Sequence, residues 1–208
     1  MELLAHNQNK NKLPQPRFSV YDRNPIEYRT FACTFDNLVE SRTFSSTDTL
    51  CYIEQFTAGD VKELERSCHQ LPVQEGYDEA RWLLRRKYGD DYRIASAYEM
   101  KALHWPSIKA EDGVALSRFT VFHTSCKNTL AGSQYISKFD QPGNIQKLVL
   151  KLPYSMRERC CCLANDIMDR QLRTVQFSDG IALGDRKARK LTNPVFGKIY
   201  DTIRSAHG

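Results

Sequence analysis

The stretch "YDEARWLLRRKYGDDYR", residues 77–93, combines a helical pattern, a tryptophan and a break in the chain. At 100° per residue, one side of the predicted helix is mainly apolar. That side carries Ala80, Leu83, Leu84, Lys87 and Tyr88. Trp82 falls almost opposite this stripe, on a polar face that it shares with Asp78, Arg85 and Arg86.

The outward position of Trp82 has two interpretations. In the first, a neighbouring loop or helix of the same chain covers the ring. In the second, Trp82, Arg85 and Arg86 contact another subunit, because tryptophan and arginine are enriched at interface hot spots. These three residues are our candidates for self-association.

The end of this helix predicts the division of the chain. Tyr88 is followed by Gly89, which we predict to be a left-handed C-cap. The break at Gly89-Asp90-Asp91 then separates two groups of helices. We expect a flexible leader at 1–14, an N-terminal bundle at 15–90, a C-terminal bundle at 91–197 and a tail at 198–208.

Caps, apolar stripes and helix breakers continue on both sides of the break. Asn24 is a predicted N-cap with Pro25 at the first helical position, and Gly59 and Pro72 are predicted to end the next two helices. The clearest stripes are Tyr28, Phe31, Phe35 and Leu38; Ile94, Tyr98 and Ala102; Phe119, Phe122, Cys126 and Leu130; and Met156, Cys160, Leu163, Ala164, Ile167 and Met168. Alternation at period two persists nowhere, so the sequence predicts an all-α fold of two small helical bundles.

Composition narrows the class of protein further. Of the 208 residues, 41% are hydrophobic and 26% are charged, which is typical of a globular chain and not of a disordered one. No apolar run approaches the ~20 residues that cross a bilayer. The first residues also lack the basic start and apolar stretch of a secretory signal. We therefore expect a cytoplasmic or nuclear protein with no membrane partner.

The seven cysteines and five histidines do not form a recognisable site. No C-x-x-C pair or zinc-finger spacing occurs, and on a helix Cys160, Cys161 and Cys162 point about 100° apart, so they cannot converge on one metal ion. His123 lies beside the stripe of Phe119 with no catalytic partner at a recognisable spacing. These patterns predict no metal, no cofactor, no small-molecule substrate and no enzymatic activity.

Charge is distributed unevenly along the chain. Residues 15–90 hold 10 basic and 13 acidic side chains, whereas residues 91–197 hold 16 basic and 10 acidic ones. The basic set Arg186, Lys187, Arg189 and Lys190 has two interpretations: a solvated helix face, or a set of contacts to RNA phosphates with a strong dependence on salt.

Four stretches, taken in order, resemble the Gag-type capsid region of the BEL/Pao retrotransposons. They are "PRFSVYDRNPIEYRTFACTFDNLV" (16–39), "DTLCYIEQFTAGD" (48–60), "YDEARWLLRRKYGDDYRIASAY" (77–98) and "TNPVFG" (192–197). The resemblance covers roughly residues 14–197. It implies that Tyr88-Gly89 closes an N-terminal capsid lobe and that a C-terminal lobe begins at Asp91.

The resemblance also implies a function. A capsid-like chain would be a structural protein that self-assembles into homo-oligomers and packages RNA mainly through charge. The alternative is a host-adopted, monomeric RNA- or protein-binding module derived from such a capsid. Two positions depart from the family pattern: Arg23 stands where a glycine is common, and Leu183-Gly184 interrupts the amphipathic pattern of the last helix.

Overall fold

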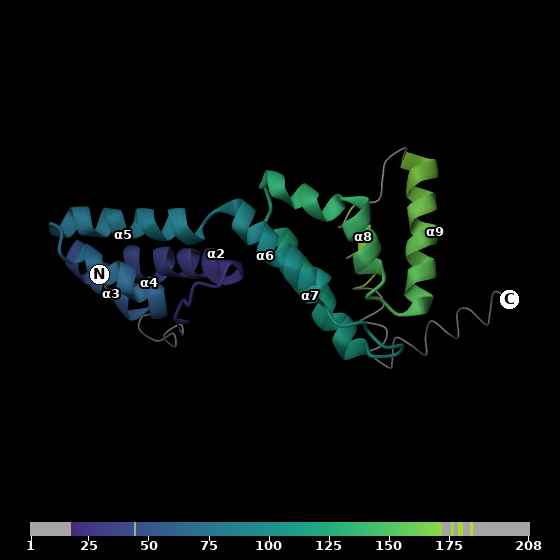
Figure 1. Cartoon of the computed structure of the whole chain (residues 1–208), viewed down its shortest axis with the longest axis horizontal. Coiled ribbons are helices and arrows are strands. Elements are labelled where there is room, and N and C mark those ends of the chain that lie inside the picture. Colours follow the sequence, from purple (N-terminus) through teal and green to yellow (C-terminus); the bar gives the residue numbers. More distant parts are fainter. Residues whose placement is uncertain (1–17, 44, 172–175, 177–178, 181–183, 185–208) are drawn as a thin grey trace, which may run out of the picture. The chain divides into compact units, whose positions relative to one another are not determined.

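The computed structural model describes residues 18–43, 45–171, 176, 179–180 and 184. Most of these residues are helical, and none forms a β-strand (Figure 1). One isolated bridge joins Tyr21 to Thr57. The predicted all-α fold is therefore confirmed for the described part of the chain. Tertiary contacts divide the molecule into two compact units, of which unit 1 ends at Gly89 and unit 2 begins at Asp90. The predicted leader and tail and the "TNPVFG" stretch lie outside the described residues.

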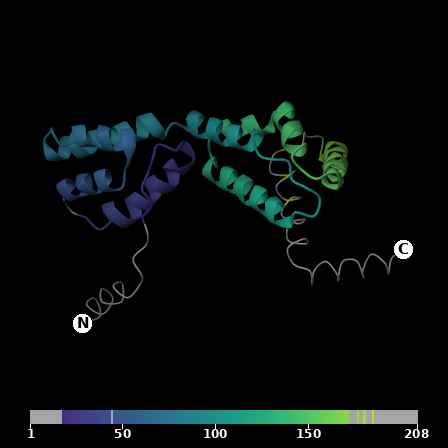
Figure 2. The same cartoon turned by 60° about the horizontal axis from the view of Figure 1, so that its bottom comes forward.

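Unit 1 is a bundle in which one long helix packs along shorter ones. Its elements are α2 (Pro25–Phe35), the π-helix η1 (Asp36–Glu40), α3 (Ser46–Gln55), α4 (Gly59–Cys68) and α5 (Val73–Tyr88). Helix α5 packs against α3 and α4, and Figure 2 shows it as the upper layer of the unit. This arrangement leaves the opposite face of α5 without a neighbouring helix among the described residues of unit 1.

Two helices of unit 1, α2 and α3, begin where side-chain caps satisfy free backbone N–H groups. The Asn24 side chain accepts a hydrogen bond from the Ile26 amide at 3.1 Å, with Pro25 next in the chain, so the predicted cap is confirmed. Ser45 caps α3 in the same way, since its hydroxyl accepts from the Asp48 amide at 3.3 Å.

Aromatic side chains fill the core of unit 1. Tyr21 is buried and stacks on Phe31 with ring centres 5.0 Å apart. The rings of Tyr28 and Tyr88 pack edge-to-face with the ring of Tyr21, with ring centres 5.9 and 5.7 Å from its centre. Burial raises the pKa of the Tyr21 hydroxyl well above its ordinary value, so the core is uncharged here. The predicted inward stripe is confirmed at Tyr28, Phe31 and Phe35. It is wrong at Leu38, because that residue falls in the π-helix η1, which buries Val39 instead.

Three other local predictions in unit 1 are wrong. Gly89 has φ −88, so it is not a left-handed cap; instead, a Cβ there would lie 2.5 Å from Cε1 of Tyr28, and glycine allows that close approach. Helix α5 begins at Val73 rather than at Tyr77. Gly59, with φ +56, is the first residue of α4 and does not end α3, whose C-cap is Phe56.

Arg23 occupies a backbone conformation that favours glycine. Its φ is +46, in the left-handed region, at the turn where the resembled family commonly has a glycine. Its guanidinium pairs with Asp60 at 2.7 Å, and both side chains are exposed. An exposed pair of this kind contributes little stability, so the arginine leaves most of the backbone strain in place.

Unit 2 is a second helical bundle. Its elements are α6 (Asp91–Leu103), α7 (Gly113–Thr129), the 3-10 helix η2 (Gln134–Asp140), α8 (Pro142–Val149) and α9 (Tyr154–Gln171). The predicted stripes of α6 and α7 are buried as expected. The sequence did not predict η2, which packs against α6 and α8 and has no helical stripe of its own.

Candidate functional site

Trp82 lies on the outer side of α5, as its position opposite the apolar stripe predicts. Its side chain is 49% exposed, whereas Ala80, Leu84 and Tyr88 are buried against the rest of unit 1. The guanidinium carbon of Arg86 lies over the indole, 4.6 Å from the ring centre. Such a cation–π contact holds both side chains in one orientation at the surface.

Ion pairs on the inner side fix the position of α5. Arg81 bonds Asp36 at 2.6 Å and Glu40 at 3.2 Å, and its guanidinium lies 5.7 Å from the ring centre of Phe35. The hydroxyl of Tyr77 donates to Glu40 as well. Burial raises the pKa of Glu40, although the charge of Arg81 opposes that shift. Helix α5 is thereby tied to α2 and η1.

Close backbone packing also fixes α5 near its start. A Cβ at Gly76 would overlap the carbonyl oxygen of Cys68 at the end of α4. Only glycine permits the two helices to approach so closely. Past the last residue of α5, the close approach of Gly89 to Tyr28 fixes the other end. The outer face of α5 is consequently presented by a helix that is anchored at both ends.

Charge is segregated along this outer face. Asp78 and Glu79 precede Trp82, whereas Arg85 and Arg86 follow it. None of the four makes an ion pair with a described residue; Asp78 accepts a hydrogen bond from Gln74 at 3.2 Å. We call Asp78, Glu79, Trp82, Arg85 and Arg86 the α5 face. From the sequence we predicted Trp82, Arg85 and Arg86 for self-association but not Asp78 and Glu79, although the seven-residue spacing of the charges indicates that all four charged residues share this face.

Glu65 is an unexpected ionisable residue inside unit 1. It lies on the inner side of α4 and is 0% exposed. Neither carboxyl oxygen has a hydrogen-bond partner among the residues that the structure describes. Burial raises the pKa of Glu65 to about 8, and the nearby charge of Arg81 offsets this only in part. In the sequence, Val61, Glu65 and Cys68 share helical spacing, which could have placed Glu65 on the buried stripe.

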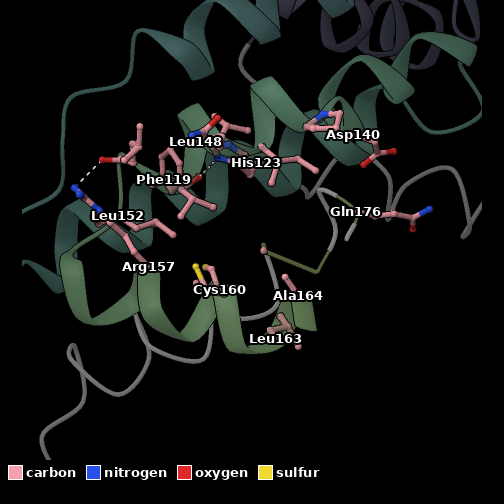
Figure 3. A pocket seen from close by; sticks show the side chains of 18 of the residues that line it. Phe119, His123, Asp140, Leu148, Leu152, Arg157, Cys160, Leu163, Ala164 and Gln176 are labelled. Carbon is pink, nitrogen blue, oxygen red and sulfur yellow. Dashed lines mark hydrogen bonds between the residues drawn. The ribbon is translucent and has the colours of Figure 1, made fainter. Parts of the chain in front are cut away.

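An apolar cavity of about 780 Å³ lies within unit 2. Figure 3 shows it between α9, which carries Cys160 and Ala164, and the side chains of Phe119, His123 and Leu148. Both ends of the cavity wall carry a charge, Arg157 at one and Asp140 at the other (Figure 3). Arg157 also donates to the carbonyl oxygens of Leu150 and Leu152, both at 2.8 Å, which tethers α9 to the preceding loop.

The thiol and imidazole beside this cavity are held in their uncharged forms. Burial lowers the pKa of His123 to about 4, while its Nδ1 lies 2.8 Å from the Phe119 carbonyl oxygen. Burial also raises the pKa of the Cys160 thiol. A nucleophilic cysteine requires a lowered pKa, so this environment opposes thiolate chemistry.

The three consecutive cysteines diverge on α9 as their helical positions predict. Cys160 is half-buried, whereas Cys161 and Cys162 are exposed. Within the described ranges, no three His, Cys, Asp or Glu side chains lie close enough to hold a metal ion. In the same part of the chain, no helix has the length and apolarity needed to cross a membrane.

The second predicted site cannot be placed. Arg186, Lys187, Arg189 and Lys190 all lie outside the described residues, and so does Leu183. Of the two residues at the predicted interruption, Gly184 is described; it is buried, and a Cβ there would lie 3.0 Å from the hydroxyl oxygen of Thr120.

Comparisons of this chain with protein-family models, with curated proteins and with solved structures found no match.

Proposed function

We propose that this chain is a non-enzymatic structural protein of the retrotransposon Gag-like capsid class, which self-associates through unit 1 and packages RNA through charge in the cytoplasm. The resemblance of the four ordered stretches supports the class. The observation that carries self-association is the α5 face, where Trp82 is half exposed on an anchored helix with Arg86 stacked upon it.

Physical chemistry favours a protein partner for this face. Tryptophan and arginine supply large contact areas, and both recur where interfaces gain most of their binding energy. Because ion pairs and close packing already fix α5, little conformational freedom remains to be lost on binding. A contact of this size is weak alone and gains strength when many copies repeat it.

The described titratable groups of unit 2 support a role without catalysis. His123 and Cys160 both line the cavity. Burial lowers the pKa of His123 to about 4, which makes its imidazole a weak general base at neutral pH. Burial raises the pKa of Cys160, which opposes formation of the nucleophilic thiolate.

Light scattering at rising protein and salt concentrations tests the proposal. We expect the mean mass of the wild type to rise with concentration. Trp82→Ala should weaken association about thirtyfold, the size of a typical hot-spot loss, while the helical circular dichroism stays unchanged. Met100→Ala is the matched control, because Met100 is a 62% exposed apolar side chain on α6, in the other unit.

One outcome would contradict the proposal, and measurements of RNA binding would then test the alternative. A wild type that stays monomeric throughout would exclude self-assembly. If RNA binding with a steep salt dependence then remained, the alternative of a monomeric host-adopted module would be favoured. Neutralising Arg186, Lys187, Arg189 and Lys190 would show whether that basic set contacts the RNA.

A further inference from the structure

We propose that two copies of this chain pair through the α5 face in antiparallel orientation, with Trp82 of both copies beside a two-fold axis. In this arrangement Asp78 of each copy faces Arg85 of the other, and Glu79 faces Arg86. The inference rests on the proposed function, because it names the geometry of the self-association.

The spacing of the charges places them in two rows. Residues seven apart on a helix differ by 700°, only about 20° short of two full turns. Asp78 and Arg85 therefore form one row, and Glu79 and Arg86 form a second row on the other flank of Trp82. Each row is about 10 Å long, at 1.5 Å per residue, with its acidic end nearer the start of α5.

This pattern is self-complementary in only one orientation. A two-fold axis across α5 at Trp82 reverses each row and keeps it on its own flank. Every acidic end then meets a basic end, which gives four contacts between opposite charges. A parallel pairing would place acid against acid and base against base. An isologous two-fold contact of the first kind is the commonest symmetry among homo-oligomers.

The existing contacts of these side chains are compatible with pairing. The guanidinium carbon of Arg86 lies over Trp82, and Arg86 makes no ion pair with a described residue, so it can still donate to a carboxylate. Arg85 is exposed and makes no ion pair with any described residue. Among the residues that the structure describes, Asp78 binds only the neutral amide of Gln74, so no described ionic partner has to be displaced.

A charge-reversal pair tests the geometry. The first variant, Asp78→Arg with Glu79→Arg, makes the α5 face basic throughout; the second, Arg85→Glu with Arg86→Glu, makes it acidic. Each variant alone should dimerise about a hundredfold more weakly than the wild type, because all four symmetric contacts become repulsive. An equimolar mixture should recover a one-to-one heterodimer with near wild-type affinity. Native mass spectrometry separates the heterodimer from both homodimers by mass.

Bulk charge does not explain the recovery of the heterodimer, and one control variant tests whether it explains the weaker homodimers. Each reversal changes the charge of one side chain by two, so the wild-type net charge of +5 becomes about +9 in the first variant and about +1 in the second. Both variants are positive, so bulk charge does not attract them to each other. Asp48→Arg with Glu63→Arg makes the same change in charge at exposed positions of α3 and α4, and it should dimerise like the wild type.

The results separate this inference from the proposed function. If the wild type self-associates but the mixture recovers no heterodimer, or the variants associate unchanged, the antiparallel pairing is wrong while self-assembly stands. If the wild type remains a monomer, both are wrong.

Discussion

Glu65 should make the stability of unit 1 depend on pH. Its carboxyl group is 0% exposed and lacks a hydrogen-bond partner among the described residues, and burial raises its pKa from 4.5 to about 8. In the unfolded chain the group ionises near its ordinary pKa. Between these two pH values the folded form retains a proton that the unfolded form has lost. The contribution of Glu65 to the stability of unit 1 is therefore highest below about pH 4.5, falls as the pH rises, and levels off above about pH 8.

The magnitude follows from the difference in proton binding. Each pH unit between the two pKa values costs about 1.4 kcal/mol. From pH 6 to pH 8 the unfolding free energy of unit 1 should fall by about 2 kcal/mol, because the slope flattens as the folded group begins to ionise. Glu65→Gln removes the titrating group and should abolish this fall.

Urea unfolding at pH 6, 7 and 8 provides the assay. The chain has two tryptophans, Trp82 in unit 1 and Trp105 in unit 2, so Trp105→Phe leaves the fluorescence of Trp82 as the reporter for unit 1. Low protein concentration keeps association from adding to the measured stability. Glu63→Gln is the matched control, because Glu63 is exposed on the same helix, and it should retain the pH dependence of the wild type.

Either of two results would refute this reasoning. A wild-type unfolding free energy that is constant from pH 6 to pH 8 would mean that Glu65 is hydrated or paired. A Glu65→Gln variant that keeps the full dependence would assign it to another group.

Two further predictions concern packing and acid stability. Gly76→Ala should destabilise unit 1 by about 1–3 kcal/mol in the same urea titration, because its Cβ would overlap the Cys68 carbonyl. Gly143→Ala, in α8 of unit 2 with open space around it, should be neutral or slightly stabilising when the fluorescence of Trp105 reports the unfolding of that unit. Burial lowers the pKa of His123 from 6.5 to about 4, so unit 2 should lose about 2 kcal/mol of stability as pH falls from 7 to 5. His123→Phe should remove that loss, as reported by the fluorescence of Trp105, and an equal loss in the variant would assign the acid sensitivity to other groups.

Much of the helical architecture could be predicted from local patterns. The cap at Asn24 and the buried positions of Tyr98 and Phe119 follow from hydrogen-bonding chemistry and from the helical repeat, which act over a few residues. The exposure of Trp82 follows from the same repeat, since the apolar stripe of its helix must face inward.

Contacts between distant segments decided what the local patterns could not. The sequence could not show that Gly89 serves the approach of Tyr28, because the two residues are far apart in the chain. Nor could it show whether Arg81 belongs to the surface; its contacts with Asp36 and Glu40 place it on the inner side of α5, and this leaves Arg85 and Arg86 for the outer face.

The sequence by itself therefore determined that the chain is helical and which side of each helix is apolar, because backbone hydrogen bonding and side-chain periodicity are local properties. Only the tertiary structure decided that Glu65 is buried without a described partner, that a cavity lies beside α9, and that α5 is anchored from within. Burial and charge pairing depend on which helices meet, and that is set by the packing of the whole unit.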